Sequence, residues 1–284
     1  MKSIIITGVS TGIGRGAAGA FARAGYRVFG SVRTEEDAAR LGEELGERFV
    51  PLVFDVTDRE AVLGAAEKVG EAVGQGGLAG LVNNAGTAVA GPLALQPLDD
   101  VREQFEANVV GLISVTQAFL PLLGMHKSRV GGYASGPGRI VNVSSVGGKV
   151  ASPFLGAYAG TKHAVEGLSD SLRRELLPYG IDVIVVRPGA VKTEIWAKGA
   201  RSKALYADSD YREPLEKFEA YAGKLAEGGY SPEDFGRLVL RAFEAKRPRT
   251  RYAIVRGRLA NWVLPTALPD RLLDRIIGRT MGLT

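Results

Sequence analysis

Short apolar runs alternate with longer amphipathic segments along most of the chain. The runs are rich in Val, Ile and Phe and are bounded by Gly, Pro or charged residues, which is typical of buried strands. Strands that alternate with helices form parallel sheets with right-handed crossovers, so the pattern predicts an α/β fold. The predicted strands are Ser3–Thr7, Arg27–Val32, Phe49–Asp55, Ala79–Asn83, Arg139–Ser144, Asp182–Arg187 and Tyr252–Val255.

The segments between the strands predict helices. The first starts straight after a glycine-rich turn, and the longest follows a loop at Thr87–Pro97. An irregular loop rich in Gly and Ser, Met125–Gly138, separates that long helix from the next strand. The predicted helices are Ile13–Ala24, Thr34–Gly46, Arg59–Val73, Leu98–Leu123, a helix that contains Tyr158 and ends near Leu177, Pro232–Ala245, and a C-terminal helix at about Asp270–Gly278.

No linker, repeat or low-complexity segment divides the chain. Its 284 residues suit one large domain or two small ones, and we predict a single domain over residues 1–284. The mixed, partly helical stretch at about 192–229 is interpreted as a lid-like insertion, and the stretch at about 256–284 as a C-terminal extension.

The composition indicates a globular protein with an ample core. Apolar residues make up 45% of the chain, and the mean hydropathy is near zero. No apolar run reaches the roughly 18 residues of a membrane span, and the N-terminus lacks signal-peptide features, so we expect a cytoplasmic protein with no integral membrane span. The lack of cysteine excludes disulfides, Cys-ligated zinc and thiol catalysis, and no metal site is predicted.

A net charge of +5 raises the question of a nucleic-acid partner, since much of the basic character lies in Lys246–Arg258. Arginines scattered over a solvated face, or facing an anionic cofactor, explain the same charge. This second interpretation is favoured, and no nucleic-acid partner is expected.

A glycine-rich turn, TGVSTGIG at Thr7–Gly14, joins the first strand to the first helix. Its glycines permit a close approach of the backbone to phosphate, and the helix N-terminus offers free N–H groups and a positive dipole end to a pyrophosphate. The spacing of Gly8, Gly12 and Gly14 departs from the usual GxGxxG motif, and no GK[ST] follows, which excludes a P-loop. An ordinary strand-to-helix turn is the alternative interpretation.

The same turn contains GVSTG at Gly8–Gly12, which matches the nucleophile elbow of hydrolases. A hydrolase of that type needs a histidine late in the chain, after an acid. The two histidines, His126 and His163, do not fit this order, and an elbow on the first strand leaves no earlier loop for an oxyanion hole. A hydrolase is therefore disfavoured, and both histidines are interpreted as surface or packing residues.

The end of the second strand indicates the type of dinucleotide. No Asp or Glu stands there, where a carboxylate would accept the ribose 2′-hydroxyl of NAD. Arg33 stands there instead, and an arginine accommodates the 2′-phosphate of NADP. Ser10 and Arg15 are expected to make a smaller contribution to binding the 2′-phosphate. NADP(H) is thus preferred over NAD(H), and the alternative is that Arg33 is an ordinary solvated loop residue.

The stretch Ser145–Lys162 combines a hydroxyl, a phenol and an ammonium group. Ser145 follows the fifth strand, and Tyr158 and Lys162 are four residues apart, so these two share one helical face. A phenol has an unperturbed pKa of about 10, and a nearby cation lowers it toward the range of a proton shuttle. The same pair is common on ordinary helices as a half-buried tyrosine beside a solvated lysine.

Further polar residues stand at strand ends and inside one helix. Asp55 ends the third strand, where it either accepts a bond from an adenine amino group or merely marks a helix entry. NNAG at Asn83–Gly86 ends the fourth strand, at the edge where ligands of open α/β sheets gather. Asn108 stands inside a predicted helix, and because Asn is a mediocre helix former, its position indicates a function.

Together these motifs resemble the short-chain dehydrogenase/reductase family. They occur in the family's order and near its spacings, from residue 3 to about 195, whereas the C-terminal third is similar only loosely. SVGG, GSVR and the long tail resemble the hydroxysteroid and retinol dehydrogenase-like branch. The motifs that carry the resemblance are TGVSTGIG, Asp55, NNAG, Asn108, Ser145, Tyr158 with Lys162, and RPG with Thr193.

The resemblance implies a Rossmann-like, doubly wound three-layer sandwich with a seven-stranded parallel sheet in the order 3-2-1-4-5-6-7. It also implies hydride transfer between a nicotinamide and an alcohol or carbonyl. Tyr158 would be the general acid/base, and Lys162 would lower its pKa and hold the nicotinamide ribose. Ser145 would bond the substrate oxygen, and Asn108 would hold a water that relays protons.

The resemblance further implies a set of cofactor contacts along the carboxyl edge of the sheet. Asn84 and Ala85 would flank the adenosine-side ribose, and Pro188, Val191 and Thr193 would border the nicotinamide. The full expected set is Gly8, Ser10, Thr11, Gly12, Ile13, Gly14, Arg33, Asp55, Val56, Asn84, Ala85, Gly86, Tyr158, Lys162, Pro188, Gly189, Val191 and Thr193.

The expected substrate is an apolar alcohol, ketone or aldehyde, because the candidate pocket residues are small or apolar. Relatives in the family assemble through helices that correspond to Leu98–Leu123 and Gly156–Leu177, which implies a homodimer or homotetramer. The long Met125–Gly138 loop departs from the family pattern and either alters subunit contacts or forms a surface loop. The candidate pocket residues are Val146, Gly147, Gly148, Ala88–Leu93, Trp196 and Tyr206.

Two alternatives stay open. The first is a catalytically weak, NADP(H)-binding redox sensor on the same fold. Such relatives tend to lose the Tyr or the Lys, so the intact set of Asn108, Ser145, Tyr158 and Lys162 favours catalysis. The second concerns the Leu-rich tail with Trp262, which forms a lid, a subunit contact or a membrane-surface helix.

Overall fold

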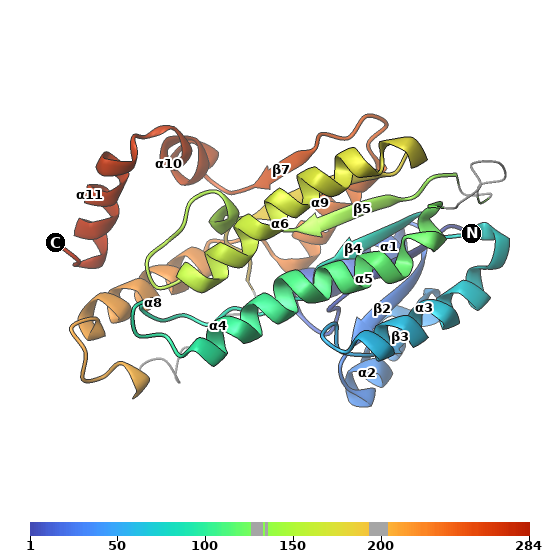
Figure 1. Ribbon diagram of the computed structural model, residues 1–284, viewed down its shortest axis with the longest axis horizontal. Helices are drawn as coiled ribbons and strands as arrows, with labels where there is room; N and C mark the ends of the chain where they lie inside the picture. The colour runs from blue at the N-terminus through green and yellow to red at the C-terminus, as the bar shows by residue number, and fades with distance from the viewer. Residues whose placement is uncertain (126–132, 134–135, 193–203) are drawn as a thin grey trace.

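The structure, a computed structural model, describes residues 1–125, 133, 136–192 and 204–284. In this part of the chain seven strands form one parallel sheet in the order β3-β2-β1-β4-β5-β6-β7 (Figure 1). The predicted α/β class and strand order are therefore confirmed. The strands are β1 (Ser3–Ile6), β2 (Arg27–Val32), β3 (Phe49–Val53), β4 (Gly80–Asn83), β5 (Arg139–Val143), β6 (Asp182–Pro188) and β7 (Arg251–Ile254).

The order of the strands reverses between β1 and β4, which are neighbours in the middle of the sheet. Ile4 of β1 pairs with Val28 of β2 on one side and with Gly80 of β4 on the other. Ligands of such sheets bind outside the carboxyl ends of the strands at this reversal. The glycine-rich turn after β1 and NNAG after β4 both lie at this position.

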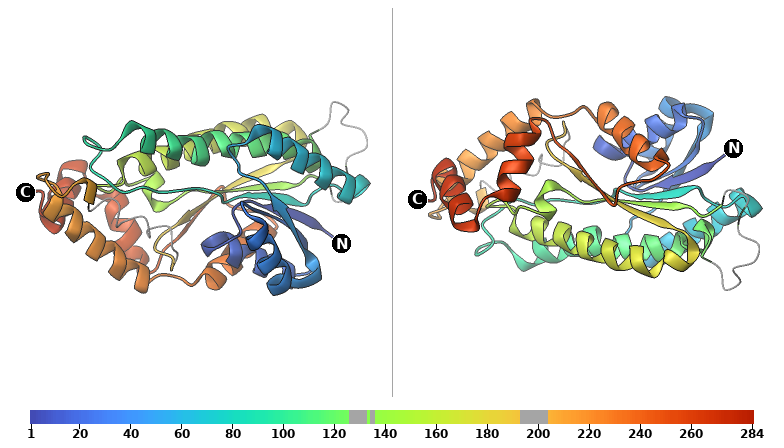
Figure 2. Two further views of the ribbon diagram at one scale, coloured as in Figure 1. Left: turned by 90° about the horizontal axis from the view of Figure 1, so that it is seen from below. Right: turned by 90° about the horizontal axis from the view of Figure 1, so that it is seen from above.

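Helices cover both faces of the sheet, which gives the predicted three-layer sandwich (Figure 2). Tight contact between the first and last helices of one layer holds that layer together. One layer consists of α1 (Gly12–Arg23), α2 (Glu35–Leu45) and α9 (Pro232–Glu244), and the other of α3 (Arg59–Val73), α4 (Leu98–Phe105), α5 (Gly111–Phe119) and α6 (Gly156–Glu175).

Helix ends follow local signals in the sequence. Thr34 and Asp58 cap α2 and α3, because each side chain accepts a hydrogen bond from a backbone N–H of the first turn. Gly46 and Gly74 follow these helices with φ values of +70° and +49°, a conformation that other residues adopt only with strain.

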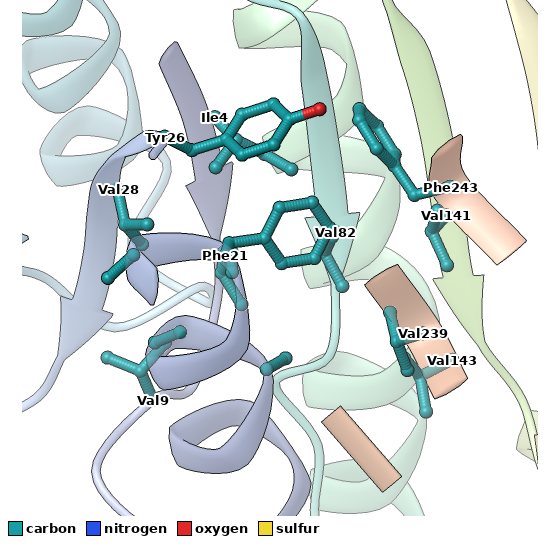
Figure 3. Packing of buried hydrophobic residues seen from close by; sticks show 14 of the residues in the cluster. Ile4, Val9, Phe21, Tyr26, Val28, Val82, Val141, Val143, Val239 and Phe243 are labelled. Carbon is teal, nitrogen blue, oxygen red and sulfur yellow. The ribbon is translucent and has the colours of Figure 1, made fainter. Parts of the chain in front are cut away.

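The core under α1 and α9 is built around three aromatic rings (Figure 3). The Phe21 ring lies edge-on to Tyr26 and to Phe243, with 5.2 Å between ring centroids in both pairs. Ile4 and Val82 of the central strands are fully buried in the same cluster. The last helix of this layer is thereby joined to the first by the same core that supports β1 and β4.

Helices α1 and α9 cross in backbone contact because each has a glycine at the crossing point. A Cβ atom on Gly236 would overlap the carbonyl oxygen of Gly16, and one on Gly16 would overlap the carbonyl oxygen of Pro232. Any larger residue at either position forces the helices apart. The crossing places α9 against the part of α1 that follows the glycine-rich turn.

The predicted helix Leu98–Leu123 is present, but it is not α-helical throughout. It consists of α4, a π-helical turn η3 (Glu106–Val110), α5 and a short 3₁₀ turn η4 (Pro121–Leu123). The correction matters because Asn108 lies in the π turn. Such turns are rare and are frequent at functional sites. Two other corrections are small, since β3 ends at Val53 rather than Asp55 and β1 at Ile6 rather than Thr7.

The C-terminal third, beyond β6, adds a helical layer at one end of the molecule. The predicted C-terminal helix is present and extends to Met281, whereas the helical turns before it were not predicted. None of the described helices is both long and apolar enough to cross a bilayer. The elements here are α8 (Arg212–Glu227), a π turn η8 (Leu259–Val263), α10 (Leu264–Ala267) and α11 (Asp270–Met281).

The glycine crossing is testable by a single methyl group. Gly236→Ala should lower the free energy of unfolding by about 2–3 kcal/mol, because the added Cβ overlaps backbone that cannot move away cheaply. Gly64→Ala in α3 is the control, since its Cβ would meet nothing within 4 Å, and it should raise stability by about 0.5–1 kcal/mol. Urea unfolding of both variants measures the difference, and equal stabilities would contradict the packing argument.

Candidate active site

Tyr158 and Lys162 lie one turn apart on α6 and are both buried against the end of β5. The Lys162 ammonium donates a hydrogen bond to the carbonyl oxygen of Val143, at 3.0 Å. Its Nζ lies 5.7 Å from the centre of the Tyr158 ring. The predicted pair is therefore not a half-buried tyrosine beside a solvated lysine, because both groups have lost most of their water.

Burial changes the pKa of both groups. Burial raises the pKa of Tyr158, and a hydrogen bond with Ser145 opposes that rise without cancelling it. Burial also lowers the pKa of Lys162 from 10.5 to about 8. From sequence we expected Lys162 to lower the pKa of Tyr158, whereas in the structure the loss of solvent dominates. The phenol is thus an acid that holds its proton at neutral pH.

Ser145 brings the third group of the motif to the same place. It is the residue before a 3₁₀ turn, η5 (Val146–Gly148), and its Oγ accepts a hydrogen bond from the Gly147 N–H at 3.0 Å. A Cβ on Gly147 would lie 3.4 Å from the Ser145 Oγ and 3.7 Å from Cε1 of Tyr158. The turn therefore lies directly against both hydroxyl-bearing residues and orients the serine towards the phenol.

Asn108 is fully buried in the π turn, and its side chain is held at both ends. Its amide donates to the carbonyl of Thr87 at 2.9 Å and to the hydroxyl of Thr161 at 3.0 Å, and its oxygen accepts from the Thr87 N–H at 2.8 Å. The residue therefore fastens the loop after β4 to α6. The expectation that it also holds a water stays a prediction.

The turns after β1 and β4 are fastened to each other. The Asn84 side-chain amide donates to the carbonyl oxygens of Thr7 and Gly8, at 3.0 and 2.9 Å. The Thr7 hydroxyl accepts from the N–H groups of Asn84 and Ala85, both at 3.0 Å. Gly86, next along, lies so close to Asn108 that a Cβ there would be 2.7 Å from its Oδ1. The glycine-rich turn and the catalytic candidates thus share one rigid edge.

The N-terminus of α1 has the features that a pyrophosphate requires. Gly8 and Gly12 have positive φ values, +68° and +54°, so the turn needs glycine at both positions. Thr11 precedes the helix without a side-chain cap, and no acidic residue stands in the first turn. The first-turn N–H groups and the positive end of the helix dipole are therefore offered to an anion. Ser10 lies in the turn, and Ile13 and Gly14 lie in the first turn of α1; their contact with a cofactor stays a prediction.

Arg33 lies directly after β2, exposed and with no ion-pair partner among the described residues. Arg15 and Ser10, which were expected to contribute less, already have partners within the protein. Arg15 pairs with Glu44 at 2.9 Å, and the carbonyl oxygen of Ser10 accepts from Arg40 at 2.9 Å. Arg40, which the sequence did not single out, therefore brings a second guanidinium to the turn while pairing with Asp37. A phosphate beside this turn would meet two arginines.

The remaining predicted cofactor residues extend along the same edge. The Asp55 carboxylate accepts through Oδ1 from the N–H and hydroxyl of Thr57, and Val56 is buried beside it. Pro188 ends β6, and Gly189 donates to the carbonyl of Ile254 at 3.0 Å.

Val191 also lies at this edge, in a parallel bridge to Tyr230. Thr193, the predicted nicotinamide contact, and Trp196, a predicted pocket residue, lie outside the described residues.

Comparison with known proteins agrees with this geometry. Residues 2–204 match the family model described as short chain dehydrogenase. The chain belongs to the short-chain dehydrogenase/reductase family. It is therefore an oxidoreductase of the class that uses NAD(P), which confirms the predicted enzyme class.

Individual relatives place this dehydrogenase within its family. It is 40% identical over 271 residues to an NADPH-dependent 3-dehydrocapnine reductase of Ornithobacterium rhinotracheale, covering 95% of this chain and 94% of the relative. It is 37% identical over 265 residues to human retinol dehydrogenase 16, covering 89% and 80%. The predicted resemblance to the retinol dehydrogenase-like branch is confirmed.

A solved structure supports the fold across the dehydrogenase. A short-chain dehydrogenase from Streptomyces avermitilis is 28% identical and superposes with a TM-score of 0.76, covering 98% of this chain and 97% of the other. The similarity therefore extends through the C-terminal layer as well as the sheet.

A buried ion cluster behind the dehydrogenase's Lys162 was missed from the sequence. Glu166, one turn further along α6, accepts two bonds from Arg187, both at 2.7 Å, and one from Arg251 at 2.9 Å. Burial raises the pKa of Glu166, but the bonds from the two arginines outweigh burial and hold it below its usual range. One signal was present, since Tyr158, Lys162 and Glu166 follow one another at four-residue spacing on a buried face.

The buried ammonium predicts an unusual pH dependence of stability. Between pH 8 and 10.5 the unfolded chain keeps the Lys162 proton that the native chain has lost, so unfolding becomes harder as the pH rises. Relative to Lys162→Met, the wild type should gain about 1 kcal/mol per pH unit in that window. Urea unfolding at a series of pH values measures the gain.

The control for this test is Lys68→Met, which removes the same charge from the exposed surface of α3. If the Lys162→Met difference stays flat from pH 8 to 10.5, the native lysine does not titrate there and the burial argument is wrong.

Proposed function

We propose that the chain is an NADP(H)-dependent oxidoreductase that transfers a hydride between the nicotinamide and an apolar alcohol or carbonyl, with Tyr158 as general acid/base. One observation carries the proposal. Tyr158 and Lys162 are buried next to each other, and the part-buried Ser145 hydrogen-bonds to Tyr158, beside a turn that is suited to a pyrophosphate. Structural proteins have no need to bury an ammonium group against a phenol, since the burial itself costs free energy.

The residues divide the proton chemistry among themselves. A bound nicotinamide supplies or accepts the hydride. In the direction of reduction, Tyr158 gives its phenolic proton to the substrate oxygen, and its raised pKa keeps that proton in place until then. Ser145 donates a hydrogen bond to the same oxygen as negative charge develops. The Lys162 ammonium, with its pKa of about 8, is mostly charged at neutral pH and stabilises the phenolate that remains.

Two features support NADP(H) as the cofactor. The end of β2 offers Arg33 and no carboxylate, and Arg40 reaches the glycine-rich turn. A 2′-phosphate is well matched by guanidinium groups, which bond to phosphate in a planar fork. The relative described as NADPH-dependent, at 40% identity, supports the same cofactor.

An apolar substrate is supported by the residues around Tyr158. Ala88 and Phe154 are buried near the site, and Tyr206 packs with Phe154 in a separate apolar cluster. This cluster joins the segment before Tyr158 to α8, so we propose that α8 and the adjoining segment act as the substrate lid of a single domain. The names of the similar proteins, a retinol dehydrogenase and a 3-dehydrocapnine reductase, support the choice of class.

The redox sensor considered from the sequence receives less support. A protein that only reports cofactor state has no use for a tyrosine whose proton is held by burial, nor for a serine turned towards it. For assembly, we propose a homodimer or homotetramer through the helical layer of α4 to α6, where the apolar Phe105 and Val110 are exposed. We propose that the enzyme works in the cytoplasm.

Tyr158→Phe tests the catalytic role. Loss of the phenolic proton donor should reduce kcat about a thousandfold, the usual range for a general acid, while NADPH affinity stays within about twofold. Turnover is measured as NADPH absorbance with a panel of aldehydes, ketones, steroids and retinoids, and affinity by fluorescence titration. Tyr252→Phe in β7 is the control for removing a hydroxyl. Undiminished turnover by Tyr158→Phe would refute the mechanism.

Arg33→Ala tests the choice of cofactor. Loss of a charge-assisted bond to the 2′-phosphate should raise the Kd for NADPH about 10- to 100-fold and leave that for NADH unchanged. Arg48→Ala removes an equally exposed arginine outside the site and should change neither constant. Equal or reversed affinity of the wild type for the two dinucleotides would show that NADP(H) is not preferred.

A further inference from the structure

The C-terminal extension exposes several large apolar side chains within one short stretch of the chain. Leu259 is 67% exposed, Leu264 48% and Ile276 47%. Val263, Leu272 and Leu283 are exposed in the same stretch. Single exposed leucines are ordinary, but a group of them within one short segment marks a surface that binds something apolar.

Helix α11 shows what else this surface carries. Its inner side, with Ile277 and Met281, packs on the cluster that includes α8. Residues at four-residue spacing lie above one another on a helix, and besides the short acidic pair Asp270 and Asp274 the outer side of α11 has two such rows. One row is apolar, Leu272 and Ile276, and the neighbouring row is Arg271, Arg275 and Arg279, all of them exposed.

The arginine row, Arg271, Arg275 and Arg279, has no ion-pair partner among the residues that the structure describes. Residues 256–284 hold five arginines against two aspartates. The tail therefore carries a net positive charge beside its exposed apolar groups. We call the set Arg271, Leu272, Arg275, Ile276 and Arg279, with Leu259, Val263 and Leu264, the tail surface.

We propose that the tail surface binds the surface of a lipid bilayer that contains anionic headgroups. The apolar row enters the boundary between headgroups and acyl chains, as in other interfacial helices. The arginines extend alongside, because their aliphatic stems lie along apolar surface while the guanidinium groups stay with the phosphates. The positive charge of the row complements the negative charge of the headgroups, and this complementarity selects lipid as the occupant.

A second copy of the chain fits the same surface less well. When identical patches meet across a two-fold axis, each arginine row faces an equal charge on its partner. Asp270 and Asp274, also four residues apart on α11, offset only part of this charge, since the tail has five arginines against these two acids. Burial of unpaired guanidinium groups at such an interface is costly.

The position of the tail surface gives the contact a consequence for the enzyme. In Figure 1, α10 and α11 lie at the end of the molecule towards which the strands run. Through Ile277 and Met281, α11 packs with Phe154 and Leu155, which precede Tyr158 in the chain. If the proposed function is correct, an apolar substrate dissolved in the bilayer reaches the site from this end. The membrane contact itself does not depend on that function.

The test is co-sedimentation of the full chain with lipid vesicles, which needs no activity. Vesicles of phosphatidylcholine with an equal amount of phosphatidylglycerol should bind the protein, and vesicles of phosphatidylcholine alone should bind it far more weakly. Replacing Arg271, Arg275 and Arg279 with Gln should reduce partitioning about fivefold per arginine, or about hundredfold in total. Leu272→Ser with Ile276→Ser should reduce it on both kinds of vesicle.

The matched control replaces three exposed arginines elsewhere, Arg48, Arg102 and Arg237, with Gln, which removes the same charge. This variant should bind like the wild type, and thermal unfolding verifies that every variant is folded. The proposal is overturned if the wild type does not bind the phosphatidylglycerol vesicles, or if the two arginine triples bind equally. A third outcome also overturns it: the wild type does not bind vesicles, and the double variant Leu272→Ser with Ile276→Ser has a lower molecular mass than the wild type in sedimentation without lipid. The tail surface is then an interface between copies of the chain.

Discussion

The site depends on a charged group that is buried away from water and hydrogen-bonded to a backbone carbonyl. Lys162 donates a hydrogen bond to the carbonyl oxygen of Val143, which is the last residue of β5. That bond fixes the distance between α6 and the strand edge, and hence the place of Tyr158. The same removal of water lowers the pKa of the amine and raises that of the phenol. The burial of Lys162 and Tyr158 therefore determines both how α6 packs against the sheet and the pKa values of the two side chains.

A second buried charge extends this constraint to the far end of the chain. Glu166 ties α6 to β6 and β7 through Arg187 and Arg251. Arg187 also lies under the ring of Trp262, 5.5 Å from its centre. The C-terminal extension therefore contacts a residue that is bonded to α6. Removing one partner of such a cluster is costly, since it leaves a buried charge unpaired.

Much of this could be predicted from sequence because the signals are local. Strands such as Arg27–Val32 are short apolar runs, and the motif residues stand at their ends. The π turn at Asn108 could not be predicted, since the helical segments on either side are too short for a one-residue shift in the apolar spacing to be recognised. The bond between Glu166 and Arg251 joins residues far apart in the chain. The direction of the Tyr158 pKa shift depends on how deeply the side chain is buried, and a sequence motif does not give that information.

The glycine crossing of α1 and α9 determines when one part of the core can form during synthesis on the ribosome. The ribosome releases the first helix early, while the helix that covers it is among the last to emerge. Until α9 has been made, Phe21 and the neighbouring apolar side chains, including those of β1, are not covered. Contacts between such distant parts of a chain form slowly and leave exposed surface in the meantime. The nascent chain therefore leaves this apolar surface exposed until its final third has been made.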